Sequence, residues 1–363
     1  MKLILLIAIS LATKAYAFPE MIRHHYVNCT ACHFSPSGGG LLTPYGRTIS
    51  SEVLSTWGTE KEARSFYGAL DNEKLNQWLQ VGGNVRALQF HHESANVKEG
   101  RTIPMQAGIE LAVTVGKWTV DLFYGKLNSD WKVEPIATRY YIMYQILDEL
   151  TVRAGRFIPV FGLNIPQHTM VTRANLGFNQ GTERDALEGM WSGEKWNFVS
   201  TVSKSVKSAS VSEVETAMTA QLNYTIADSY RVGASYWLGT SDTQNRQILG
   251  LHAVLGFTER FFILAEADYQ NRHQATTQRT QYGLYQFSKY GYEFYKGIHA
   301  QFVQEYSQSD FSNDKSKFES YGPGFLFYPR PHFEFEGLYT KKKISIVGDD
   351  FEDYAYLMIH YYF

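Results

Sequence analysis

The sequence lacks several features that would place a protein in a common class. Only two of its 363 residues are cysteine, too few for a disulfide-rich secreted scaffold. Beyond residue 12 no apolar run approaches the ~20 residues that a membrane-spanning helix requires. The mean hydropathy of −0.29 also excludes a bundle of such helices. The formal net charge is only −2, which argues against nucleic acid as a partner.

The single apolar run lies at the N-terminus and has the layout of an export signal. Lys2 precedes an apolar stretch at 3–12, and Ala15-Tyr16-Ala17 has the A-x-A pattern of a cleavage site. The stretch is too short to cross a bilayer as a helix. We therefore predict a signal peptide over 1–17 and a mature protein that begins at Phe18.

Aromatic residues, by contrast, are abundant. They make up 15% of the chain, with 25 Tyr and 23 Phe, and transmembrane barrels need aromatic girdles at both membrane interfaces. From residue 77 onward, apolar and polar residues alternate with period two. At 218–224, for example, Met, Ala, Leu and Tyr alternate with Thr, Gln and Asn. This alternation predicts strands with one face toward lipid and the other toward a polar lumen.

The connections between these strands alternate in length. Tight turns such as Gly116-Lys117 alternate with longer segments such as Glu93–Arg101 and Gly162–Asp185. Short periplasmic turns and longer external loops are the rule in outer-membrane barrels, and 162–185 would be the third external loop. We predict an all-β fold over 77–363: a 16-stranded antiparallel transmembrane β-barrel in the bacterial outer membrane, in contact with its lipid. The alternative is a soluble β-sandwich.

The two cysteines fall in one motif, Cys29-Thr30-Ala31-Cys32-His33. In a C-x-x-C-H segment each thiol adds to one vinyl group of a haem, and the histidine binds the iron as proximal ligand. The alternatives are a redox-active pair, which expects a βαβ context, a zinc half-site, which needs two further ligands, and a disulfide. The predicted export of the chain favours haem over these alternatives, because haem of this type is attached outside the cytoplasm. We predict one covalent haem c on a head at 18–76, which is weakly helical from residue 60.

Six residues are candidates for the sixth ligand of the haem iron. Three lie just before the motif, namely Met21, His24 and His25, and three others are predicted to face the barrel lumen, namely Met105, His299 and His360. A His–His pair would give a lower reduction potential than a His–Met pair. Oxidation of Fe(II) at acid pH would need a high potential. The sequence leaves the choice open.

The order of these segments resembles the fused monohaem cytochrome–porin family, which includes outer-membrane iron oxidases of iron-oxidising bacteria. The likeness rests on the haem motif, on Pro36 and on Leu42-Thr43-Pro44-Tyr45-Gly46-Arg47, and it covers 18–47. The likeness of the barrel is architectural. The resemblance implies a small cytochrome c-like head and electron transfer between an extracellular donor, such as Fe(II), and a periplasmic carrier. The glycines at 38–40 depart from the family pattern and leave the donor and the direction of electron flow open.

Two further sets of charged residues are candidates for functional roles. Arg47 follows the haem motif closely enough to pair with a haem propionate through charge-assisted hydrogen bonds, although a solvated arginine is the alternative. Five acidic residues are predicted to face the lumen: Glu110, Asp121, Glu266, Asp268 and Glu305. They could attract a cation, or they could belong to an ordinary hydrated lumen.

Three functions compete at this point. The first is electron transfer across the outer membrane, with the chain acting as an Fe(II):cytochrome oxidoreductase. The second is a diffusion porin with a haem-containing plug of structural or sensing role. The third is a haem enzyme such as a peroxidase, which would need a distal acid–base residue for which the sequence has no motif. No catalytic residue is assigned, and no hydrolase motif is present.

Overall fold

The structure, a computed structural model, describes residues 19–25, 32–36, 38–69, 73–126, 136–165, 167, 169–207, 211 and 213–363. The predicted signal peptide and the first part of the haem motif, including Cys29, lie outside the described residues. No helix in the described ranges combines the length and apolarity needed to cross a membrane.

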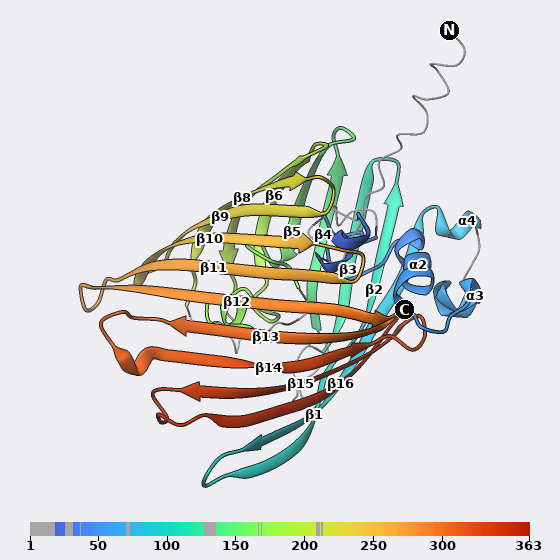
Figure 1. Cartoon of the computed structure of the whole chain (residues 1–363). Coiled ribbons are helices and arrows are strands. Elements are labelled where there is room, and N and C mark those ends of the chain that lie inside the picture. Colours follow the sequence, from blue (N-terminus) through green and yellow to red (C-terminus); the bar gives the residue numbers. More distant parts are fainter. Residues whose placement is uncertain are drawn as a thin grey trace.

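Sixteen antiparallel strands close into a single barrel (Figure 1). In chain order they are β1 (Leu79–Glu93), β2 (Lys98–Val115), β3 (Trp118–Lys126), β4 (Ile136–Gln145), β5 (Leu150–Phe157), β6 (Arg184–Ser192), β7 (Trp196–Ser205), β8 (Thr216–Ile226), β9 (Tyr230–Thr240), β10 (Gln244–Gly256), β11 (Phe261–Gln274), β12 (Arg279–Tyr295), β13 (Ile298–Gln308), β14 (Lys317–Phe327), β15 (Phe333–Ile344) and β16 (Glu352–Tyr362). Each strand pairs with its neighbours in sequence, and β16 pairs with β1 in the register Asn84↔Tyr362. Closure leaves no sheet edge unpaired. The predicted barrel and its strand number are confirmed.

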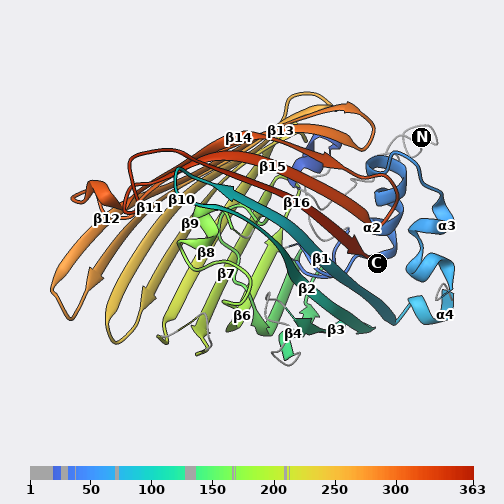
Figure 2. The ribbon, with the colours of Figure 1, turned by 90° about the horizontal axis from the view of Figure 1, so that it is seen from below.

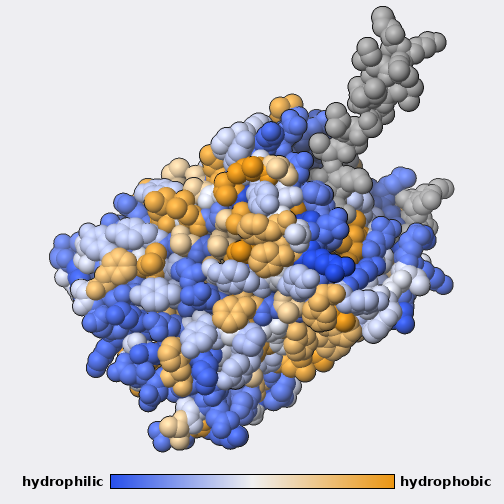
Figure 3. Space-filling view, viewed as in Figure 1, coloured by the Kyte–Doolittle hydropathy of each residue, from blue (hydrophilic) through white to orange (hydrophobic). Residues whose placement is uncertain are grey.

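The period-two alternation sorts side chains between the outside and the lumen, as predicted. On β8, Met218 is 55% exposed, whereas its neighbour Thr219 is 4% exposed. Gln221 and Asn223 are also buried, on the same inward face as Thr219. In Figure 3, apolar side chains gather over the middle of the strands, and hydrophilic ones gather toward the outer hairpins and the head. This distribution is typical of a lipid-facing barrel wall.

The connections alternate in length as expected except at 94–97, 241–243 and 275–278, which are as short as the turns at the opposite end of the barrel. The sequence predicts a loop over 93–101, but the hairpin turn is only 94–97. Pairing continues to the turn because Glu93 lies opposite Lys98, and the Lys98 Nζ is 3.0 Å from the Glu93 carboxylate. The prediction was wrong here because polar residues were assigned to a loop when they form a cross-strand ion pair.

The third external loop, 158–183, folds into the lumen and packs against its wall. It carries one helical turn, α5 (Val171–Ala174). Loop side chains join two buried apolar clusters with inward residues of β8–β13. One contains Leu163, Ile165 and Met170 with Val254, Phe262, Leu264, Phe287 and Val303, and the other contains Phe161, Val171, Leu176 and Phe178 with Ala217, Trp237, Ile248 and Tyr285. The predicted constriction loop is therefore present.

Polar contacts fix the path of this loop. Two inward carboxylates accept hydrogen bonds from loop backbone: Glu266 from Leu163 N at 3.1 Å, and Glu305 from Val171 N at 2.9 Å. Gly162 has φ +60°, and a Cβ there would overlap the Glu266 carboxylate. Glycine is therefore required where the loop backbone passes Glu266.

The head consists of short helical segments at the end of the barrel where the short turns lie, beside the C-terminus (Figures 1 and 2). They are η1 (Pro19–His24), α2 (Pro44–Ile49), a π-helical turn η2 (Ser50–Leu54), α3 (Glu60–Ala63), η3 (Ser65–Gly68) and α4 (Glu73–Asn76). Thr43 caps α2 through a hydrogen bond from Gly46 N, and Thr59 forms a capping box with Glu62 on α3. The weak helical pattern from residue 60 thus becomes three separate short turns.

Candidate functional site

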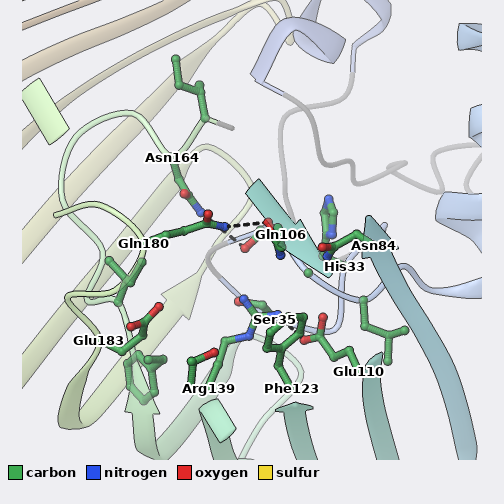
Figure 4. A pocket seen from close by; sticks show the side chains of 18 of the residues that line it. His33, Ser35, Asn84, Gln106, Glu110, Phe123, Arg139, Asn164, Gln180 and Glu183 are labelled. Carbon is green, nitrogen blue, oxygen red and sulfur yellow. Dashed lines mark hydrogen bonds and ion pairs between the residues drawn. The ribbon is translucent and has the colours of Figure 1, made fainter. Parts of the chain in front are cut away.

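One cavity lies where the head, the loop 158–183 and the barrel wall meet. Its volume is about 210 Å³, which is many times the ~10–15 Å³ that one water molecule needs. The wall comes from β1–β5 and from the ends of β15 and β16. Figure 4 shows Gln180 and Glu183 of the loop on one side, and His33 and Asn84 on the other. A space of this size between separate elements is large enough for a ligand.

The haem-motif segment forms one wall of this cavity as a small hairpin. Cys32 is buried, and Thr43 N donates to its carbonyl at 2.9 Å. His33 forms an isolated antiparallel bridge with Leu42, and Phe34 N donates to Leu41 O at 3.1 Å. These contacts hold His33 on the cavity wall, where it is 6% exposed.

The glycines that depart from the family pattern form the tip of this hairpin. Gly40 has φ +68°, and a Cβ there would lie 2.5 Å from Arg139 Nη2 and 2.8 Å from Glu110 Oε1. Only glycine allows the hairpin to turn at such close range to the barrel wall. The same hairpin meets the loop, because Asn164 Nδ2 donates to Gly38 O at 3.4 Å.

Burial lowers the pKa of the His33 imidazole to about 4. The ring is therefore neutral at ordinary pH, which is the form that binds a metal. A neutral, buried histidine beside a cavity, preceded by a buried cysteine, fits a covalently attached haem. A haem there would be held by Cys32 and His33, together with Cys29, which lies outside the described residues. No group of three or more His, Cys, Asp or Glu side chains in the described ranges could hold a bare metal ion.

Three arginines of the barrel wall line the cavity, namely Arg86, Arg139 and Arg153, and none of them was predicted as a site residue from the sequence. Arg139 on β4 pairs with Glu110 on β2 at 2.5 Å, and Arg153 on β5 pairs with Glu188 at 2.7 Å. Arg153 also donates to Ser35 Oγ of the head at 3.2 Å. Their inward position follows from strand parity, so the alternation could have revealed them.

The three sixth-ligand candidates that precede the motif lie elsewhere. Met21 is packed in an apolar cluster with Ile49, Leu54, Leu326 and Tyr328. Burial lowers the pKa of His24 to about 4, with Arg23 adding to the effect. His25 is exposed, and its Nδ1 lies 3.0 Å from Ser229 Oγ. None of the three lines the cavity that contains His33.

Arg47 is buried against the barrel rather than on the cavity wall. Its guanidinium donates to Gln80 Oε1 at 3.0 Å and to Val81 O at 2.8 Å, both on β1. It thereby fastens α2 to the first strand. Contact with a propionate stays a prediction, because the arginines that line the cavity are Arg86, Arg139, Arg153 and Arg173.

The five acidic residues face inward as predicted, but they are not spread over a hydrated lumen. Glu266 and Glu305 hold the loop, as described above. Glu110 pairs with Arg139, and Asp121 lies 3.9 Å from the same guanidinium. Asp268 is buried beside Glu266. Most of these charges are therefore occupied by protein partners and serve first to anchor the loop and the wall.

Comparison with known proteins gives a fold but no family. No protein-family profile and no curated protein matches the sequence. Solved structures do match: OprB of Pseudomonas putida (TM-score 0.62, 10% identity, 86% of this chain and 99% of that chain) and the anion-selective porin of Comamonas acidovorans (0.62, 8%, 78% and 99%). The outer-membrane channel DcaP of Acinetobacter baumannii is also similar (0.58, 12%, 78% and 97%).

These likenesses establish the porin fold of the barrel. At such low identity they carry nothing about solutes or selectivity, and they leave the head and its haem motif untested. The resemblance to fused cytochrome–porins therefore stays a prediction, as do the haem, its ligands and the electron-transfer partners.

Proposed function

We propose that the chain is an outer-membrane channel of the porin type, narrowed by its third external loop and partly closed at the periplasmic mouth by its N-terminal head. The closed 16-strand barrel, the apolar outer face and the similarity to solved porins support this assignment. Solutes would pass through the part of the lumen that contains the cavity, beside β1–β5. The opposite side is filled by the loop.

The observation that carries the proposal is the way the lumen is filled. The loop packs on β8–β13 through apolar contacts, while the side formed by β1–β5 keeps a cavity of about 210 Å³ whose wall carries charged side chains. Solutes on this path would pass Glu183 of the loop and Arg139 of the wall. We therefore expect a small conductance whose ion selectivity depends on these cavity charges.

Single-channel recording in planar bilayers tests this expectation, with one matched pair of variants. Glu183→Gln removes a carboxylate on the cavity wall, whereas Asp185→Asn removes one that is exposed and paired with Arg156 at 2.9 Å. The first should shift the cation-to-anion selectivity and the second should not. A wild-type protein that passes no current, or equal effects of the two variants, would contradict the channel assignment.

A second candidate function, electron transfer across the outer membrane, is favoured by one specific observation. His33, buried and neutral, forms part of the cavity wall near the periplasmic end of the barrel. A single covalent haem c held by Cys29, Cys32 and His33 would supply one-electron exchange between ferrous and ferric iron at this point. One electron would leave an extracellular donor, such as Fe(II), and one would reach a periplasmic carrier.

This candidate is tested with oriented outer-membrane vesicles and a membrane-impermeant ferrous chelate added outside. Rapid reduction of the haem absorbance in the wild type, and its absence in the Cys29→Ala/Cys32→Ala variant, would support electron transfer from Fe(II). A haem that dithionite reduces and the external chelate does not would exclude Fe(II) as donor and leave the plugged channel as the better account.

A further inference from the structure

A second histidine faces the cavity that contains His33. His360 lies near the periplasmic end of β16, is 8% exposed and lines the cavity. Its Nδ1 is 2.8 Å from Glu334 Oε2 on the neighbouring strand β15. Its Nε2 is buried and has no hydrogen-bond partner among the described residues.

These contacts fix the chemical state of the ring. An ionised carboxylate only accepts hydrogen bonds, so Nδ1 of His360 must carry the proton and donate it to Glu334. A protonated Nε2 would then be a buried donor without an acceptor, close to the guanidinium of Arg86 on the paired position of β1. The neutral tautomer avoids this cost and leaves a lone pair on Nε2.

This arrangement is the one that prepares a histidine to bind a metal. Histidine ligands usually donate their second ring nitrogen to a carboxylate, which fixes the tautomer and makes the ligating nitrogen more basic. From the shared cavity and the buried Nε2 without a hydrogen-bond partner among the described residues, we infer that His360 would be the second protein ligand of the iron of the haem that His33 would bind. The inference rests on the haem of the second candidate function.

Competing ligands in the described part of the chain are less well placed. Haem iron is bound by His, Met, Cys or Tyr side chains. Among the described residues, the cavity is lined by two histidines, His33 and His360, by one tyrosine, Tyr362, and by no methionine. The Tyr362 hydroxyl is already bonded to Ser50 Oγ at 3.0 Å. His299, another lumen candidate, lies instead near Arg23, which it meets at 3.0 Å.

The head is tied to the same end of β16 that carries His360. Ser50 of η2 bonds to Tyr362, whose ring lies 5.2 Å from the His360 ring. Phe66 of η3 packs on the terminal Phe363 with ring centroids 4.8 Å apart. Both contacts fix the head on the strand that presents His360, so the two histidines are held on walls of one cavity by rigid elements.

The inference narrows the class of electron donor. A His–His haem has a lower reduction potential than a His–Met haem. The donor should therefore be a species that gives up electrons at low potential, rather than Fe(II) in acid. The proton shared between His360 and Glu334 is expected to lower the potential further, because a donor to carboxylate is a stronger ligand.

Electron paramagnetic resonance of the purified full-length haem protein is the first test. The wild type should give the low-spin ferric spectrum of two histidine ligands. His360→Ala should lose that spectrum, become high-spin and regain the low-spin form with added imidazole. His24→Ala is the matched control, because His24 is half-buried and lies outside this cavity, and it should keep the wild-type spectrum.

The outcomes separate the ligand from the function. A wild type without covalent haem ends the proposed haem function itself. If the wild type carries a covalent haem whose spectrum is high-spin or shows His–Met ligation, His360 is not the ligand. This result comes from the wild-type protein alone and does not depend on whether a variant folds. A low-spin His360→Ala also overturns His360 as ligand. As a second variant, Glu334→Gln keeps the ligand but removes the anionic acceptor, so it should remain low-spin and raise the reduction potential.

Discussion

The two sides of the barrel lumen are filled in different ways. On the side of β8–β13, inward apolar side chains such as Trp237 and Phe262 pack on the loop 158–183, and inward carboxylates such as Glu266 accept hydrogen bonds from its backbone. On the side of β1–β5, β15 and β16, inward side chains such as Glu110, Arg139 and His360 are polar, and a cavity remains. The N-terminal segment follows the same division. Its helix η1 is buried against β10 and β11, whereas α3 meets the rim near β15 through polar contacts.

The difference teaches how one barrel can hold an inserted loop and an N-terminal head and still keep a cavity. Apolar burial is non-directional and fills space, so it fastens the loop and η1 without leaving a cavity. Buried charges need partners at defined geometry, as in the Arg153–Glu188 and His360–Glu334 pairs. Such pairs hold side chains back against the wall, and the space between them stays open for a ligand.

The largest effect is expected where the apolar side is broken. Phe262 is fully buried in the cluster with Ile22 and Leu163, so Phe262→Ala leaves a cavity that the strands cannot close. We expect a loss of about 3–5 kcal/mol in the free energy of unfolding. Urea unfolding in lipid vesicles, followed by tryptophan fluorescence, measures it.

The matched control for this prediction is Phe257→Ala. Phe257 lies at a periplasmic turn and is 47% exposed, so it buries less area. The loss in the free energy of unfolding for Phe257→Ala should be less than half of the loss for Phe262→Ala. Equal losses for the two variants would mean that the apolar packing on the side of β8–β13 contributes no more to the free energy of unfolding than an exposed turn does. The proposed difference between the two sides of the lumen would then be wrong.

A smaller effect is expected on the cavity side, at the tip of the hairpin that carries His33. Gly39 and Gly40 both have positive φ, but a Cβ at Gly39 meets nothing within 4 Å, whereas one at Gly40 meets Arg139 and Glu110. We expect about 1 kcal/mol for Gly39→Ala, from backbone strain alone, and about 2 kcal/mol for Gly40→Ala. Hydrogen exchange over 38–43 measures the free energy of local opening. If the two variants lower the free energy of local opening by the same amount, the tip of the hairpin is not in close contact with the barrel wall.

The barrel could be predicted from sequence because its signal is local. Alternation at Met218, Thr219 and their neighbours places each side chain outside or inside without reference to the rest of the chain. The same parity put Glu110 and Glu266 in the lumen. Turn lengths then gave the strand number and the position of the third external loop.

What those lumen residues contact could not be predicted, because the partners are far apart in the chain. Glu266 was expected in a hydrated lumen, yet it accepts a hydrogen bond from Leu163 N, 103 residues away. His360 and Glu334 meet only because β15 and β16 pair in one register. No periodic pattern encodes the distance between such residues, so the cavity could not be seen before the fold was known.

The rim on the cavity side should respond to pH. His332, in the turn before β15, has its Nε2 2.7 Å from Glu62 O on α3, and burial lowers the pKa of its imidazole, with Arg47 adding to the effect. A group whose folded pKa is depressed binds more protons when unfolded. Its contribution to docking is therefore fully present above pH 6.5 and is lost as the pH falls below that value.

Hydrogen exchange over α3 between pH 8 and pH 5 tests this dependence. Protection should fall at the acid end in the wild type, whereas His332→Gln, which keeps a donor but does not titrate, should lose the pH-dependent part. A wild-type profile that is flat across this range would show that His332 does not control docking of the head.

The smallest effect is expected at the exposed ion pair of the same rim. Arg330 Nη1 lies 2.9 Å from Glu62 Oε1, with the arginine side chain about half exposed. Solvent and salt screen such a pair, so Arg330→Ala should cost only about 0.2–1 kcal/mol. The loss should shrink in high salt because the Debye length falls to ~3 Å at 1 M. Hydrogen-exchange rates over α3 at low and high salt measure this loss. A loss larger than that of Phe262→Ala would show that the polar contacts of the cavity side contribute more stability than the apolar packing of the opposite side.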